Sequence, residues 1–297
     1  MTVLVQSVPV PNGTLTPVWR RPIAWRTVAL LALVAWLYAP ILLRLSLQWR
    51  SDPNFSHGFF VPLFSLFVVW QDRQRLGAIR RRPSNWGIPL ILISLSMLIL
   101  GVMGSELFLS RFSLLLLITG LVIFFLGWEF FRALLFPLAF LVLMIPIPTI
   151  LFNQITFPLQ ILASKLSAWF LPLLGVPVLR EGNIINLPAM PLEVADACSG
   201  IRSLMTLTTL TIMYGYLLER RVLVRVLLAI AAIPIAVIAN GFRIVGTGLL
   251  VQYWDPDKAQ GFFHEFSGWL IFVVSLFMLF FLHRFTTAVF HRREAGE

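Results

Sequence analysis

Long apolar stretches follow one another along most of this 297-residue chain. A helix needs about 20 predominantly apolar residues to cross the hydrocarbon core of a membrane. Leu, Ile and Phe fill these stretches without the alternation of polar and apolar residues that a membrane barrel requires. Because only helices and closed barrels satisfy their backbone polar groups in lipid, the sequence predicts an all-α, polytopic membrane protein.

Composition and charge agree with this class. Hydrophobic residues make up 59% of the chain and charged residues 12%, whereas a soluble domain has about 45–50% and about 25%. The net charge of +10 is concentrated in short Arg clusters between the apolar stretches, which is the distribution that orients membrane helices. We therefore expect a lipid bilayer as the environment and no nucleic acid as a partner.

The same pattern divides the chain into three parts. Residues 1–22 are polar and Pro-rich and are predicted to be a disordered cytoplasmic segment. Residues 23–285 are predicted to be a single integral membrane domain, and residues 286–297 a cytoplasmic tail. The first apolar stretch is longer than the core of a signal peptide and lacks a small-residue cleavage site, so we interpret it as a membrane span.

Apolar stretches and Arg clusters together predict about eight transmembrane helices with both termini in the cytoplasm. The clusters at 73–82, 220–225 and 284–293 mark the cytoplasmic side. The expected spans are about 23–47, 59–70, 87–103, 107–126, a fifth from after 132 to about 145, 199–218, 222–251 and 267–285.

One further apolar segment, 152–172, carries a polar stripe. Gln160, Ser164 and Ser167 recur at i, i+4 and i+7, which indicates one face of a helix. We interpret this segment as an interfacial helix, because a crossing here would put the later Arg clusters on the outer side. The polar loop at 175–197 then lies outside, and a small β-hairpin is expected in it around 184–187.

Cys198, the only cysteine in the chain, follows this loop. A single thiol excludes an intramolecular disulfide and a site with two thiolate ligands. Asp196 can cap the next helix, which would place Cys198 in its first turn, and Arg202 follows one turn later. A helix N-terminus and a nearby positive charge each lower the pKa of a thiol and increase its nucleophilicity. The alternative is a small buried cysteine beside an arginine that extends to the interface.

Two other polar groups are expected at the same membrane face. Arg243 lies within an apolar span, and such an arginine usually faces a polar cavity or a partner. It could stabilise an oxyanion, or form a structural ion pair with Glu193 or Asp196. His264, just before the last span, is a candidate general acid or base, with a solvated interfacial histidine as the alternative. His57, in the first outer loop, could also reach this site, although a lone histidine is more often structural.

Other catalytic motifs are missing from the sequence. It contains no His-Glu-x-x-His, no Gly-x-Ser-x-Gly and no Walker loop. The first outer loop has a single acid, Asp52, so the acidic pair expected of a lipid-linked sugar transferase is missing. No acidic residue lies clearly in the middle of a span, which argues against an ion-coupled transporter. We expect neither a cofactor nor a metal.

Four pieces of the chain resemble the exosortases, the bacterial relatives of the archaeosortases: DPNFSHG at 52–58, EVADACSGIR at 193–202, NGFRI at 240–244 and the outer His264. The resemblance extends from about residue 36 to residue 285. It implies eight spans and an external triad of Cys, Arg and His, here Cys198, Arg243 and His264. Asn240 belongs to the motif that contains the arginine and is a supporting candidate.

The resemblance also implies an activity. Exosortases are expected to cleave the C-terminal PEP-CTERM sorting signal of membrane-anchored, exported proteins and to pass the new C-terminus to an acceptor, often in strains that make exopolysaccharide. The chain would then be a cysteine-dependent peptidase/transpeptidase, a hydrolase of the bacterial inner membrane, with its site on the periplasmic face and an accessory protein as a conceivable partner. Two alternatives stay open: a non-enzymatic component of exopolysaccharide export or assembly, and a cysteine-dependent acyltransferase with lipid donors.

Overall fold

The computed structural model describes residues 22–194, 200–254 and 262–294. The chain forms two units, Met1–Arg44 and Leu45–Glu297. The described part of the first unit belongs to helix α1 (Pro22–Ser51), and most of its apolar side chains are exposed, as expected for a helix surrounded by lipid. All contacts described below lie within the second unit.

The second unit is predominantly helical, as the sequence predicts. After α1 the elements are η2 (Pro53–Phe59), α2 (Phe60–Gln71), α3 (Arg73–Ala78), α4 (Gly87–Met103), α5 (Leu107–Phe125), α6 (Trp128–Ala133), α7 (Leu135–Phe140), η3 (Leu141–Met144), α8 (Thr149–Leu173), β1 (Leu179–Glu181), β2 (Ile184–Asn186), β3 (Pro191–Glu193), α10 (Gly200–Leu218), α11 (Val222–Tyr253) and α13 (Phe262–Glu294). The last helix continues through most of the expected cytoplasmic tail.

Within the described residues, four helices are long and apolar enough to cross a membrane. They are Trp25–Ser51, Leu107–Phe125, Val222–Tyr253 and Phe266–Ala288. A fifth span results if Leu135–Met144 and Thr149–Leu173, which meet at a bend of 86°, are counted as one broken span. The all-α membrane class is therefore confirmed, but the prediction of about eight spans is not.

The missing spans have a physical explanation. Helices α2 and α4 have 12 and 17 residues and are about 18 Å and about 26 Å long, short of a hydrocarbon core of about 30 Å. The expected fifth span is divided into α6, α7 and η3. Helix α10 has 19 residues but contains four threonines, so it is less apolar than the four helices above. Sequence hydropathy identified apolar segments, but it did not show where each helix breaks.

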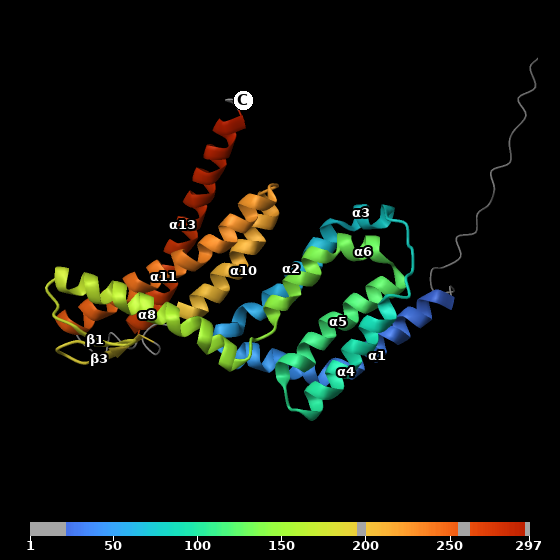
Figure 1. Ribbon diagram of the computed structural model, residues 1–297, viewed down its shortest axis with the longest axis horizontal. Coiled ribbons are helices and arrows are strands. Elements are labelled where there is room, and N and C mark those ends of the chain that lie inside the picture. The colour runs from blue at the N-terminus through green and yellow to red at the C-terminus, as the bar shows by residue number, and fades with distance from the viewer. Residues whose placement is uncertain (1–21, 195–199, 255–261, 295–297) are drawn as a thin grey trace, which may run out of the picture. The chain divides into compact units, whose positions relative to one another are not determined.

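Helices α4 and α5 form an antiparallel hairpin (Figure 1). The two backbones approach so closely at both ends that only glycine fits. A Cβ atom at Gly87 would lie 2.5 Å from the carbonyl oxygen of Gly120, and one at Gly101 would lie 2.6 Å from the amide nitrogen of Ser110. Small residues at such contacts are typical of helices that pack in membranes, where dispersion contacts replace the hydrophobic effect.

The basic loop between α3 and α4 lies at one end of this hairpin. The Arg82 amide donates to the Leu126 carbonyl over 3.1 Å, and the Ser84 amide donates to the Ile123 carbonyl over 3.3 Å. These bonds satisfy carbonyl groups that the C-terminal end of α5 leaves without helical partners. The turn between α4 and α5 therefore lies at the opposite end of the hairpin from the Arg cluster.

Helix α8 turns its polar stripe inward. Ser164 Oγ donates to the Gly182 carbonyl over 3.0 Å, and Ser167 Oγ donates to the Gly241 carbonyl of α11 over 3.1 Å. The exposed face instead carries large apolar side chains, including Ile155 and Trp169. A helix in the membrane interface is expected to turn such a stripe toward water, but Ser164 and Ser167 are fully buried against neighbouring backbones. Small hydroxyl groups allow close contact with a neighbouring backbone and bond to its carbonyls.

A three-stranded antiparallel sheet follows α8, in the order β1-β2-β3. Glu181 pairs with Ile184 across a turn at Gly182, whose φ is +66°, and Ile184 pairs in turn with Glu193. The expected hairpin is confirmed, and β3 extends it. The Val194 amide donates to the Asn183 carbonyl over 3.0 Å, and Val194 is fully buried. The sheet thus anchors the chain just before the segment that holds Cys198.

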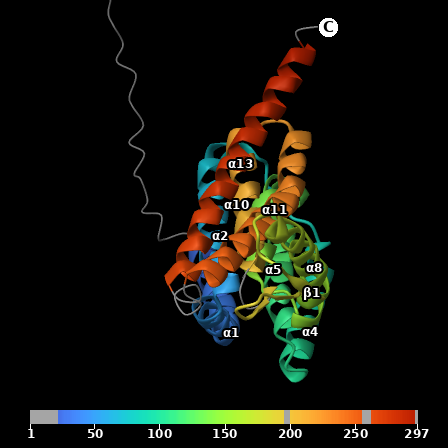
Figure 2. The ribbon, with the colours of Figure 1, turned by 90° about the vertical axis from the view of Figure 1, so that its left-hand side faces the viewer.

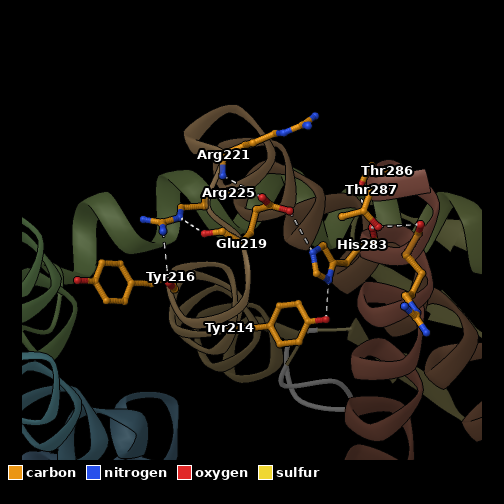
Figure 3. Close-up of polar contacts among 9 residues, drawn as sticks. Tyr214, Tyr216, Glu219, Arg221, Arg225, His283, Thr286 and Thr287 are labelled. Atoms are coloured by element: carbon orange, nitrogen blue, oxygen red, sulfur yellow. Dashed lines mark hydrogen bonds and ion pairs between the residues drawn. The ribbon is translucent and has the colours of Figure 1, made fainter. Parts of the chain in front are cut away.

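Helices α10, α11 and α13 pack side by side (Figures 1 and 2). A polar cluster joins the turn between α10 and α11 to α13 (Figure 3). Glu219 Oε2 lies 3.4 Å from His283 Nε2, and His283 Nδ1 lies 2.7 Å from the Tyr214 hydroxyl. The Arg221 amide donates to Glu219 Oε1 over 2.9 Å, and Arg225 Nε donates to the Glu219 carbonyl over 2.7 Å. We call these five residues the Glu219 cluster.

The contact between α4 and α5 gives a first prediction. We expect Gly87→Ala to lower the thermal stability of the detergent-solubilised protein by about 1–3 kcal/mol, because the added methyl group overlaps the α5 backbone. Gly246→Ala is the matched control: it also lies in an apolar helix, but among the described residues a Cβ there meets nothing within 4 Å. Thermal unfolding of both variants checks this, and equal melting temperatures would contradict the close contact.

The Glu219 cluster gives a second prediction. The Arg221 amide, together with His283, lowers the pKa of Glu219 below its ordinary value, against an opposing effect of burial. A lowered folded-state pKa contributes stability that is present above the unfolded pKa and is lost as the pH falls through the folded pKa. We therefore expect Glu219→Gln to reduce the loss of stability between about pH 6 and about pH 3. Glu129→Gln, in an exposed pair with Arg82, should leave the pH profile of the melting temperature unchanged.

Candidate active site

Arg243 is a buried charge in the wall of a helix bundle. It lies in α11 and its residue surface is 4% exposed. Its Nε donates to the Ser267 Oγ of α13 over 3.2 Å. A Cβ at the neighbouring Gly268 would lie 3.3 Å from an Arg243 terminal nitrogen. A hydroxyl group and a glycine on the first turns of α13 thus accommodate the guanidinium group.

The α11 segment around Arg243 is enclosed on a second side by α8. Ser167 bonds to the Gly241 carbonyl, as described above, and a Cβ at Gly248 would lie 3.1 Å from the Leu171 side chain. Asn240, one turn before Arg243, is 8% exposed. The NGFRI motif is therefore the part of α11 that packs against both α8 and α13, which explains why it combines small and polar residues.

His264 lies in the first turn of α13, three residues before Ser267. Its backbone position is therefore about one helical turn from the residue that contacts Arg243. The histidine side chain lies outside the described side chains. The backbone of residue 264 and Arg243 lie at the same end of the α11–α13 pair.

Cys198 and Asp196 lie outside the described residues. The chain is described up to Val194, which the sheet holds, and again from Gly200, where α10 begins. Glu193 is exposed at the end of β3, and Arg202 is exposed in the first turn of α10. The expected positions of Cys198 in a helical turn and of Asp196 as its cap remain predictions.

His57 belongs to a different part of the second unit. It lies in η2, which packs against α10, α2 and η3, and its ring is 6.5 Å from that of Phe55. The residue is 4% exposed, and neither ring nitrogen has a hydrogen-bond partner of acceptable geometry among the described residues. Burial lowers the pKa of His57, and backbone groups of Leu143 and Asn54 oppose that shift in part. Its role as a supporting residue stays a prediction.

Ser267 is one of two residues with structural contacts that sequence reasoning missed. Its only sequence signal is the Ser-Gly pair that follows His264 at i+3 and i+4, positions that share a helix face. His283 is a second example. It belongs to a chemically unremarkable Arg-rich end in the sequence, but its side chain is only 12% exposed and bonds to Glu219 and Tyr214.

The described residues contain no group of three or more His, Cys, Asp or Glu side chains that could hold a metal ion. The groups that the structure does bring together are an arginine, a hydroxyl group and the start of the helix that carries His264. These are groups that can bind an anion or a developing oxyanion and transfer protons.

Comparison with known proteins identifies the family. Neither the curated proteins nor the solved structures contain a match to this chain. A family model described as transmembrane exosortase, Exosortase_EpsH, matches residues 49–281, which include Cys198, Arg243 and His264. Because the match covers well over half of the 297 residues, the chain belongs to the transmembrane exosortase family.

Proposed function

We propose that the protein is a membrane-embedded cysteine peptidase/transpeptidase whose catalytic residues are Cys198, Arg243 and His264. It would cleave the C-terminal, PEP-CTERM-like sorting signal of an exported protein and transfer the new C-terminus to an acceptor. The observation that carries the proposal is the buried Arg243, which bonds to α13 one turn beyond His264, within the segment that matches the exosortase family.

Helix lengths support convergence of the three residues. The Glu219 cluster joins one end of α10, α11 and α13. Arg243 lies 21 residues after the start of α11 at Val222, His264 lies 19 residues before His283, and Gly200, the first residue of α10, lies 18 residues before its end at Leu218. At 1.5 Å per helical residue these three positions are roughly 27–32 Å from that cluster, and Cys198 precedes Gly200 by two residues in the sequence. This distance matches the thickness of a hydrocarbon core of about 30 Å, so the three residues would share the opposite membrane face.

In the proposed reaction the Cys198 thiolate attacks the scissile carbonyl carbon. The carbonyl π electrons move to oxygen, and a tetrahedral oxyanion forms. When the oxyanion collapses, the C–N bond breaks, the leaving amine takes a proton, and a thioester to Cys198 remains. An acceptor amine, hydroxyl group or water then attacks the thioester and releases the thiolate. Asp196 and Arg202 are proposed to favour the thiolate through the helix end and a nearby positive charge.

Arg243 is proposed to stabilise the oxyanion. A guanidinium in an apolar environment is a strong donor to a developing negative charge, because little water competes for it. The Ser267 hydroxyl engages Nε, the nitrogen nearest the helix, and so holds the plane of the guanidinium group in one orientation. We propose Ser267 as a positioning residue that acts through Arg243.

His264 is proposed to shuttle protons. As an imidazolium it would donate to the leaving amine, and as a neutral imidazole it would accept a proton from the incoming acceptor. Histidine as a residue type can both donate and accept a proton near physiological pH. Asn240, Glu193 and His57 are proposed to support the site by packing and charge, and the reaction as written needs neither cofactor nor metal.

The proposed location is the bacterial inner membrane, with both termini in the cytoplasm and the site on the periplasmic face. The distribution of arginines supports it, because Arg220, Arg221 and Arg225 all lie in or near the turn that belongs to the Glu219 cluster, at the end remote from Arg243. A substrate anchored by its own hydrophobic span would reach this site laterally through the bilayer. An accessory protein of the same pathway is proposed as a further partner.

Because Cys198 is the only thiol in the chain, it can be tested directly. We expect a membrane-impermeant maleimide, added to intact spheroplasts, to label wild-type protein and to leave Cys198→Ser unlabelled, since the thiol should face outward as a reactive thiolate. Labelling only after permeabilisation would contradict the periplasmic position.

In the same cells Cys198→Ser should reduce cleavage of a reporter with a C-terminal sorting signal by at least about a thousandfold.

Mass spectrometry of the reporter's C-terminus distinguishes the proposal from its alternatives. Cleavage at the sorting signal supports a peptidase/transpeptidase, whereas an intact C-terminus with an added acyl group would indicate an acyltransferase. Reporter processing that continues unchanged in Cys198→Ser would fit a non-enzymatic membrane component and would exclude the proposed nucleophile.

The contact between Arg243 and Ser267 gives the next prediction. We expect Arg243→Gln to lower the rate of reporter cleavage about 10²–10³-fold, as loss of an oxyanion donor does. Ser267→Ala should lower kcat by about tenfold, with KM unchanged and with rescue by Ser267→Thr, because only the orientation of the guanidinium group is relaxed. Arg220→Gln, an exposed arginine in the turn before α11, is the control and should retain activity. A Ser267→Ala protein with normal kcat would contradict the positioning role.

A further inference from the structure

A cavity of about 330 Å³ lies far from Arg243, beside the turn between α4 and α5. Its walls come from that turn, from the first turns of α5, from the Pro-rich linker with the start of α8, and from Gln48 of α1. Binding sites for small molecules have volumes of about 300–1,000 Å³, so the cavity can hold a small polar group. Thr149 begins α8 at this cavity, whereas Ser167 contacts α11 18 residues later, roughly 27 Å along the helix.

Arg111 lines this cavity as a buried cation. Only 3% of its surface is exposed, and its Nε has no hydrogen-bond partner among the residues that the structure describes. Within the described part of the chain, no carboxylate oxygen lies within ion-pair distance of its guanidinium group. Burial of an unpaired charge is costly, and the cost falls if a ligand supplies an anion. The arginine therefore indicates a negatively charged ligand group.

Glu106 lines the same cavity and is exposed. Its Oε2 accepts hydrogen bonds from the amides of Phe108 over 2.9 Å and Leu109 over 3.3 Å, so the side chain caps α5. The carboxylate would repel a simple anion in the cavity. One buried cation together with one carboxylate nearer the surface instead matches a ligand that carries both charges.

The rim of the cavity is apolar and exposed. Leu107 is 44% and Ile150 is 74% exposed. The cavity lies at the end of the α4–α5 hairpin that is remote from the Arg82 loop. It is therefore at the level of the lipid headgroups on the membrane face opposite that loop. A ligand held here would have its charged part inside the cavity and apolar surface beside Leu107 and Ile150.

We propose that this cavity binds the headgroup of a zwitterionic phospholipid with a primary ammonium group. The lipid phosphate would accept hydrogen bonds from Arg111, and its ammonium group would donate to Glu106. The acyl chains would lie against the exposed rim. A trimethylammonium headgroup has no N–H to donate, and an anionic glycerol headgroup has no cation for Glu106, so the site selects against both. This lipid site is separate from the proposed catalytic residues.

Native mass spectrometry of the full-length, detergent-solubilised chain tests the proposal. The probes are short-chain phosphatidylethanolamine, phosphatidylglycerol and phosphatidylcholine, with inorganic phosphate as a competitor. We expect wild-type protein to retain phosphatidylethanolamine preferentially. Arg111→Gln should weaken its binding by about tenfold or more, as loss of a charge-assisted hydrogen bond does. Arg81→Gln, an exposed arginine in the basic loop, should have no effect.

Glu106→Gln removes the carboxylate charge and leaves Arg111 in place. The helix cap is retained, because the amide oxygen still accepts hydrogen bonds from the Phe108 and Leu109 amides. This variant should lose the preference for phosphatidylethanolamine over phosphatidylglycerol while it retains the phosphate contact. If Arg111→Gln does not fold, this change in selectivity decides the question. Equal retention of all three lipids by the wild type would overturn the proposal. Displacement of bound phosphatidylethanolamine by inorganic phosphate would also overturn it, and so would displacement by an acidic peptide added instead of lipid.

Discussion

A guanidinium group buried between apolar helices is the constraint on which the arrangement of α11 and α13 depends. Arg243 is 4% exposed, and a buried charge costs several kcal/mol unless polar groups engage it. Ser267 supplies the acceptor, and Gly268 leaves room for the terminal nitrogens. Both residues belong to the first turns of α13, so this helix must begin at the level of Arg243. The backbone position of His264, in the same first turns, therefore follows from the polar contacts that Arg243 requires.

A second polar contact holds the other end of the same helix pair. Glu219 bonds to His283, and Tyr214 bonds to the other nitrogen of that histidine. Apolar side chains in lipid distinguish poorly between neighbouring helix registers, because lipid tails are as apolar as the helices. An axial shift of one residue, about 1.5 Å, would stretch the contacts at both ends. Polar contacts at the two ends therefore set the register that would bring the proposed catalytic residues to one membrane face.

Small residues determine how the helices approach one another. Gly87 allows α4 and α5 to touch along their backbones, and the Ser164–Ser167 face lets α8 bond to the carbonyls of its neighbours. In the sequence these residues indicate flexibility or polarity, yet in the structure they form contact surfaces. Arg111 differs from these residues, since its Nε is buried without a hydrogen-bond acceptor in the described part of the chain. A buried polar group that bonds to a neighbouring helix serves packing, whereas we assign a buried polar group without such a bond to ligand binding.

The sequence by itself determined the all-α membrane class, the hairpin before the cysteine and the presence of an arginine within an apolar helix. Each of these depends on local properties: hydropathy over one helix length, a turn at Gly182, and the cost of a charge within an apolar stretch. Only the tertiary structure decided how many helices are continuous, which way the serine stripe of α8 faces, and that Ser267 holds Arg243. These features depend on which neighbouring helix each face meets, and helical periodicity shows that a face exists without identifying its partner.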